Sequence, residues 1–187
     1  MALPSIALAH ATSKADSGAL SAADLAYALD VLEVPFIAGG FRSPAFQMPQ
    51  PAELMVSLAA SEEARIRLAL IPLLLCHPEF SHYVASTVRR MPPTVQTGFK
   101  CYYTAAMLLQ QKHWKRLAAL FGSVNPLPDL FSSELLVHSW SDPDGGLALL
   151  AERQTMLTGR AINWLGTYEH GAERLLRTLE RRTEWPA

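Results

Sequence analysis

The side chains most able to do chemistry gather at positions 76–83, in the run Cys-His-Pro-Glu-Phe-Ser-His-Tyr. Zinc-binding helices place two histidines four residues apart, so that both side chains face the metal. His77 and His82 are five residues apart, and Pro78 is predicted to begin a new helix between them. The spacing therefore predicts a helix junction, with Glu79 in the first turn, and no metal site.

Cys76 and Cys101 are the two cysteines of the chain, and both lie in apolar stretches that are predicted to be helical. Free thiols in such positions behave as small hydrophobic side chains. A catalytic cysteine would need a histidine beside it as a base, and the sequence does not exclude that Cys101 faces His77, His82 or His113. No motif supports such a pair, and no disulfide is predicted.

The known catalytic and cofactor motifs that can be read from short spacings do not occur in the chain. These are the G-x-S-x-G elbow, the P-loop, the glycine-rich dinucleotide fingerprint and the H-E-x-x-H helix. Asp142, Asp144 and Gly145 resemble the start of a calcium loop, but Arg153 occupies the twelfth position, where a bidentate glutamate is required. We therefore predict no cofactor and no metal.

A second polar cluster lies between Gly159 and the last predicted helix, at residues 160–170. One interpretation is a loop that contacts a ligand or a partner through Trp164, Tyr168 and His170. The other is structural: Thr167 caps the last helix, and Trp164 covers the core. Both interpretations stay open on the sequence alone.

Helical periodicity accounts for most of the chain, and no alternation typical of strands is present. Ser21 with Asp24 predicts a capped helix start, and Pro51 is suited to a first helical position. The apolar run from 66 to 75 predicts a central helix, with a kink or a boundary at Pro72. The longest helix is predicted from the proline pair at 92–93 to about Phe121.

The remaining elements follow from turn and capping signals. Gly122 is expected to end the longest helix, and residues 141–146 form a strong turn before a helix over about 147–157, closed by Gly159. A short helix is expected over about 130–137, and the last helix follows Thr167. The sequence predicts a shared buried core that includes Leu70, Leu74, Tyr103, Ala106 and Leu117.

The predicted fold is all-α: a single irregular bundle of about seven helices, with a short HEAT-like helical stack as the alternative. No segment repeats at the period of about 40 residues that a stack requires. Residues 1–20 are predicted to be a loosely attached arm, and 21–187 a single helical domain. The longest apolar run has nine residues, far below the roughly 20 that cross a bilayer. Residues 1–11 are apolar but lack the basic segment that begins a secretory signal, and Lys14 is the first cation, so a cytoplasmic protein without a membrane partner is expected.

Charge is unevenly distributed along the chain, although the formal net charge is only −1. Residues 61–125 carry a net +5, and the segments 1–60 and 126–187 carry −3 each. Either the acidic flanks neutralise the basic middle in the fold, or a basic face docks an acidic protein or RNA. The cations predicted to form that face are Arg89, Arg90, Lys112, Lys115 and Arg116.

Five segments resemble a group of bacterial all-helical proteins: residues 64–75, 77–80, 102–106, 127–131 and 163–170. That group is similar to the helical partners of small nucleotidyltransferases in toxin–antitoxin-like pairs. In well-known pairs of this kind, the helical member is a HEPN ribonuclease with an arginine followed four to six residues later by a histidine. No arginine of this chain has a histidine at that distance, so the resemblance does not imply ribonuclease residues.

Two classes of function compete, and a small-molecule sensor is the third alternative. The first is a non-catalytic helical interaction or regulatory protein that binds an acidic protein or RNA through the basic face and the aromatic segment. The second is an enzyme acting on RNA or nucleotides, with a site formed by His77, Glu79 and His82, or by Tyr168, Glu169 and His170. Convergence of either group in one pocket would favour the enzyme, and separate capping roles would disfavour it.

Overall fold

The computed structural model describes residues 20–37, 44, 46–137 and 142–184, of which 74% are helical. No strand occurs within these ranges, and the predicted all-α fold is confirmed. Of the predicted N-terminal arm, only Leu20 belongs to the described residues. The helices, with the 3-10 helix η1 among them, are α1 (Ala22–Val31), α2 (Pro51–Ala60), α3 (Ala64–Leu68), α4 (Leu70–Cys76), η1 (Pro78–Tyr83), α5 (Val84–Arg90), α6 (Pro93–Lys112), α7 (Trp114–Phe121), α8 (Ser132–Leu135), α9 (Pro143–Thr158) and α10 (Trp164–Glu184).

Several helix ends lie where local chemistry predicted them. Ser21 and Asp24 form a complete capping box at the start of α1, and Pro51 is the first residue of α2. Gly122 follows α7, and Gly159 ends α9 with a left-handed backbone at a φ of 65°. These positions are predictable because each cap satisfies backbone groups within its own turn.

The boundary predicted at Pro72 lies slightly earlier, at Ala69, between α3 and α4. A proline cannot donate a hydrogen bond to the residue four positions before it, and its ring crowds that carbonyl group. The chain therefore starts a new helix at Leu70, which places Pro72 in the first turn of α4, where no such bond is needed.

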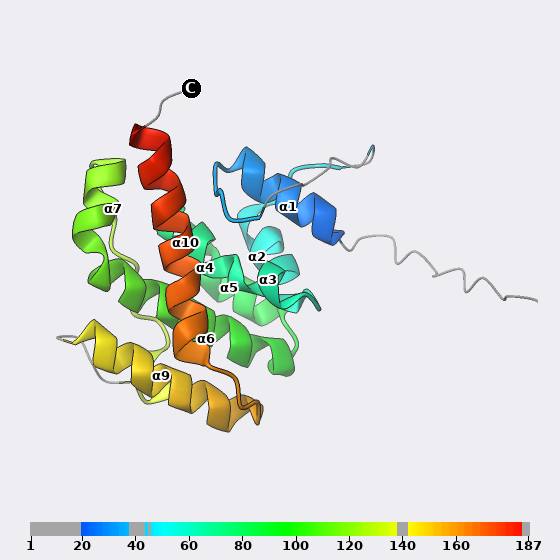
Figure 1. Ribbon diagram of the computed structural model, residues 1–187. Coiled ribbons are helices and arrows are strands. Elements are labelled where there is room, and N and C mark those ends of the chain that lie inside the picture. Colours follow the sequence, from blue (N-terminus) through cyan, green and yellow to red (C-terminus); the bar gives the residue numbers. More distant parts are fainter. Residues whose placement is uncertain (1–19, 38–43, 45, 138–141, 185–187) are drawn as a thin grey trace, which may run out of the picture.

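The long helix predicted from the proline pair to Phe121 is divided, which corrects that prediction. His113 has a φ of −102° and a ψ of 18°, and it separates α6 from α7. The periodicity hides this break because hydrogen bonds continue on both sides: His113 donates to Leu109, and Leu117 donates to His113. In Figure 1, α7 turns away from the axis of α6 and follows α10.

Two predicted helix starts were also wrong. The residues predicted to form a turn at 142–146 belong to the start of α9, where the Asp142 side chain accepts a hydrogen bond from the Gly145 amide at 3.0 Å. The last helix begins at Trp164, before Thr167, since the Asn163 side chain accepts from the Gly166 amide at 2.9 Å. Both starts use Asx caps, which compete with turns for the same residues.

The helices pack around α6, with α4 and α9 against it and α10 crossing it (Figure 1). In a solenoid, each repeat contacts only its neighbours. Here α10 packs on α3, α4, α6, α7 and α9, so the arrangement is an irregular bundle. Gly171 permits the close approach of α10, because a Cβ atom there would lie 3.2 Å from the Leu68 side chain.

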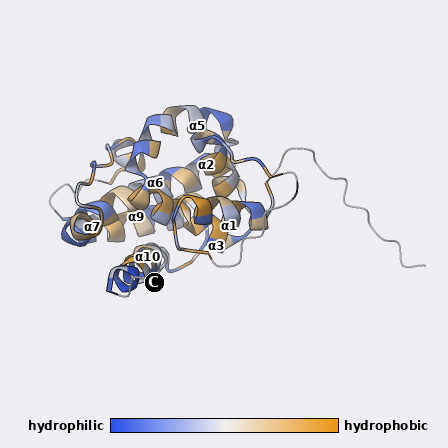
Figure 2. Cartoon of the chain, turned by 90° about the horizontal axis from the view of Figure 1, so that it is seen from above, coloured by the Kyte–Doolittle hydropathy of each residue, from blue (hydrophilic) through white to orange (hydrophobic). Residues whose placement is uncertain are grey.

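The predicted core is confirmed: all five of its residues are buried in one hydrophobic cluster that extends from α1 to α10. Leu70, Leu74 and Ala106 are 0% exposed. The C-terminal end of α10, by contrast, is hydrophilic (Figure 2). None of the described helices is both long and apolar enough to cross a bilayer.

We expect Leu74→Ala to lower the free energy of unfolding by about 2–5 kcal/mol, because it empties a packed site in the centre of the bundle. Urea unfolding followed by circular dichroism measures this change. Leu157→Ala is the control: its side chain is 55% exposed, and its loss should cost about 0.5 kcal/mol or less. A loss below about 1 kcal/mol for Leu74→Ala would show that α4 is not central.

Candidate functional site

The cations predicted to form a basic face lie on three helices. Arg89 and Arg90 are exposed at the end of α5, Lys112 ends α6, and Lys115 and Arg116 lie in the first turn of α7. Arg90 lies 3.9 Å from a Glu53 carboxylate oxygen, which is a long contact. The five cations are therefore spread over three helices and do not line one helix.

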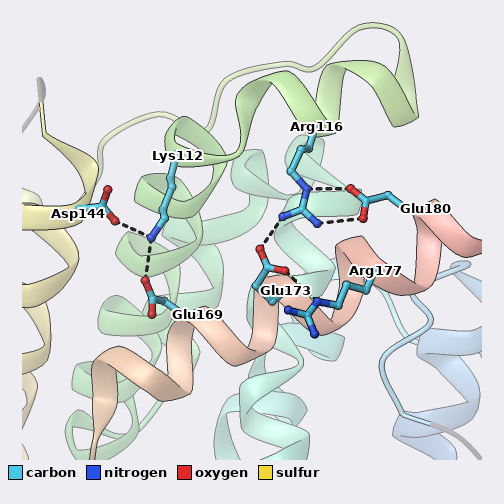
Figure 3. A network of polar contacts seen from close by, with 7 residues as sticks. All are labelled: Lys112, Arg116, Asp144, Glu169, Glu173, Arg177 and Glu180. Atoms are coloured by element: carbon cyan, nitrogen blue, oxygen red, sulfur yellow. Dashed lines mark hydrogen bonds and ion pairs between the residues drawn. The ribbon is translucent and has the colours of Figure 1, made fainter.

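Lys112 and Arg116 are paired with carboxylates from the acidic C-terminal third (Figure 3). Lys112 Nζ lies 2.5 Å from Asp144 and 2.7 Å from Glu169. The Arg116 guanidinium donates twice to Glu180, at 2.8 and 3.0 Å, and once to Glu173, at 2.5 Å; these are its contacts with α10. We call these pairs the clamp, because they join α6 and α7 to α9 and α10.

The clamp shifts the protonation of its members. Hydrogen bonds from Arg116 hold the pKa of the Glu180 carboxyl below its usual value. Burial alone would raise the pKa of Glu173, but the hydrogen bond and the charge of Arg116 outweigh it, and that pKa is also lowered. Both carboxylates are therefore ionised at neutral pH, and the positive charge of Arg116 is neutralised within the chain.

The predicted aromatic contacts are mostly enclosed. Tyr168 is 0% exposed, and its hydroxyl donates a hydrogen bond to Gln154 in the interior. Trp164 is 7% exposed, and its Nε1 donates to the Arg160 carbonyl at 3.3 Å. His170 is exposed on α10. The Tyr168 ring therefore belongs to the core and not to an exposed face, and the covering role of Trp164 holds.

The groups considered for catalysis do not converge. His77 bridges the Glu79 carboxylate and the Leu32 carbonyl, both at 2.8 Å, whereas His82 is exposed. Tyr168 is in the core, and Glu169 belongs to the clamp. Neither group of residues therefore meets in one pocket among the described side chains.

The two thiols are unsuited to act as nucleophiles. Burial raises the pKa of Cys101 to about 12, and burial with the nearby Glu79 charge raises that of Cys76 to about 12. The reactive form of cysteine is the thiolate, which is scarce at neutral pH for such groups. Across the described ranges, no three His, Cys, Asp or Glu side chains are grouped so that they could hold a metal ion.

A concave site of about 610 Å³ lies where the ends of α2 and α3 meet the start of α6 and the end of α9. We call it the arginine hollow. Its lining residues come from segments that are far apart in sequence: Ala59, Ala60, Ser61, Arg67, Pro93, Thr94, Val95, Thr97, Gly98, Tyr102, Gln154, Leu157, Thr158, Arg160 and Trp164. Its volume is in the range of ordinary ligand pockets.

Arg67 and Arg160 give the hollow its charge, since its lining contains no acidic residue. Arg67 is held in place by the chain, because Nη1 donates to the carbonyls of Ser61 and Glu62 at 2.6 and 2.7 Å. Burial raises the pKa of Tyr102, and the adjacent Arg67 offsets part of that shift. Within the described residues, neither arginine forms an ion pair with a carboxylate, so the hollow can bind an anionic group.

This site was not among the sequence predictions. Arg67 and Arg160 lie within segments noted above, but only the fold brings them together. Gly98 provided a signal, because an isolated glycine inside a helical pattern costs about 1 kcal/mol relative to alanine. Gln154 provided no signal, since glutamine is an ordinary helix former.

Comparisons with protein-family models, with curated proteins and with solved structures found no match for this chain. The hollow and the clamp are therefore interpreted from their own geometry.

The clamp should make stability depend on pH. The pKa values of Glu173 and Glu180 are lower in the folded chain, so their contribution is present above the unfolded value of about 4.3 and is lost as pH falls through their folded values. Between about pH 6 and about pH 3, the wild type should therefore lose more unfolding free energy than Arg116→Met. Because both carboxylates are about a third exposed, we expect a difference on the order of 1 kcal/mol.

Urea unfolding at the two pH values measures this difference. The control is Arg89→Met, which removes an exposed cation outside the clamp and should keep the pH dependence of the wild type. Equal pH dependence in wild type and Arg116→Met would show that the clamp does not stabilise the fold.

Proposed function

We propose that the protein is a non-catalytic helical interaction or regulatory protein, which binds an acidic segment of a partner protein at the arginine hollow. The observation that carries this proposal is the position of Arg67 and Arg160 in one concave site that has no acidic residue in its lining. Two arginines without a carboxylate attract an acidic group, and Arg67, which backbone carbonyls hold in place, can fix the orientation of that group.

An acidic protein suits the site better than RNA. Domains that bind nucleic acid through electrostatics are usually strongly basic, whereas this chain has a sequence pI near 6.6 and a formal charge of −1. The clamp neutralises two of the cations that could have contacted phosphates, Lys112 and Arg116. Two arginines in a hollow suit one or two carboxylates better than a long polyanion.

The absence of a nucleophile–base pair among the described side chains supports the non-catalytic assignment, since His77 and Tyr168 have structural partners. The resemblance noted in the sequence makes a small nucleotidyltransferase the first partner to test. The regulatory role would then consist of covering or positioning that enzyme.

We expect Arg160→Glu to weaken binding of the acidic partner by about tenfold or more, because it replaces an attraction with a repulsion inside the hollow. Arg160 is exposed, so the fold should tolerate the change. Isothermal titration calorimetry of the full chain with a purified partner, first obtained by co-purification, measures the affinity at low and high salt.

Lys115→Glu is the matched control: it has the same change of charge on an exposed residue of α7 outside the hollow, and it should alter affinity by less than about threefold. If Lys115→Glu weakens binding and Arg160→Glu does not, the partner docks on the face first predicted from sequence. Tighter binding of single-stranded RNA than of the protein partner would replace the acidic protein with RNA.

A further inference from the structure

One polar side chain in the lining of the hollow is Gln154. It is 2% exposed, and its Oε1 accepts a hydrogen bond from the Tyr168 hydroxyl, which holds the side chain in place. Its amide nitrogen is a hydrogen-bond donor, and it can serve a carboxylate that is bound in the hollow.

Gly98 leaves open space in the same hollow. It lies inside α6 and lines the hollow, yet a Cβ atom built on it would meet no atom within 4 Å. Neither packing nor a positive φ requires glycine here. A glycine of this kind allows another backbone to approach the helix closely.

An apolar rim adjoins the hollow at the end of α9 and in the loop that follows. Leu157 lines the hollow and is 55% exposed, and its neighbour Met156 is 70% exposed. Ile162, in the loop between α9 and α10, is 46% exposed. Leu157 therefore offers an exposed apolar contact within the hollow to an apolar side chain of a partner.

We propose that the partner inserts an extended segment in which an acidic residue lies next to an apolar one. The carboxylate binds between Arg67 and Arg160 and accepts a hydrogen bond from the Gln154 amide. The segment's backbone crosses α6 at Gly98, and its apolar side chain covers Leu157. This inference rests on the proposed function and adds the form of the ligand, a short acidic–apolar segment of a polypeptide.

The test is a selection of random 12-residue peptides displayed on phage against the full chain, followed by fluorescence polarisation with one selected peptide. We expect the selected peptides to share an Asp or Glu beside an apolar residue. Gly98→Leu should weaken binding of that peptide by about tenfold or more, because its side chain fills the space that the segment needs. Replacing the acidic residue of the peptide by Ala should have a similar effect.

Gly98→Ala is the graded variant: its single methyl group takes up part of the space that the segment needs, so it should weaken binding by less than Gly98→Leu does. Thermal unfolding shows whether both variants fold; alanine and leucine favour helix, so neither should melt below the wild type. The inference would be overturned by selected peptides that share no acidic residue, or by equal binding of the peptide to wild type and Gly98→Leu. It would also be overturned if no peptide is selected while inorganic phosphate binds the hollow. If Arg160→Glu weakens binding of the partner protein and Gly98→Leu does not, the proposed function stands and this inference fails.

Discussion

The burial of α6 on every side is the constraint on which the rest of the bundle depends. Ten consecutive residues, 101–110, are buried, so other helices must cover all faces of this segment. α4, α9 and α10 provide that cover, and the polar side chain of Gln110 is satisfied by the loop beyond α7. Its amide contacts the Asn125 carbonyl and the Leu127 backbone N–H, which holds this loop against the core.

The same geometry divides the basic middle of the chain into two groups with different roles. Lys112 and Arg116 meet carboxylates that lie 57 and 64 positions further along the chain, because α7 follows α10. Arg67 is instead held by backbone carbonyls and keeps its charge available in the hollow. A net charge of +5 therefore describes the middle of the sequence correctly, although it cannot indicate which cations remain free of a carboxylate.

The sequence predicts the structure correctly where the deciding chemistry is local, as at Ser21 and Gly159, and incorrectly where two local signals compete. Asn163 and Thr167 are both good caps four residues apart, and the burial of Trp164 selects the earlier one. The break at His113 has no local signal, since it lets α7 pack on α10. The hollow could not be predicted for the same reason: its walls come from three stretches that are far apart in sequence, at 59–67, 93–102 and 154–164.

The hollow also contains a residue that lowers the stability of its own helix. Alanine in place of Gly98 would favour helix by about 0.5–1 kcal/mol without meeting any atom. This loss lies in the site that also contains Arg67 and Arg160, which form no ion pair with a carboxylate among the described residues. A departure from local stability of this kind is expected at a functional site, since binding of a ligand can offset it.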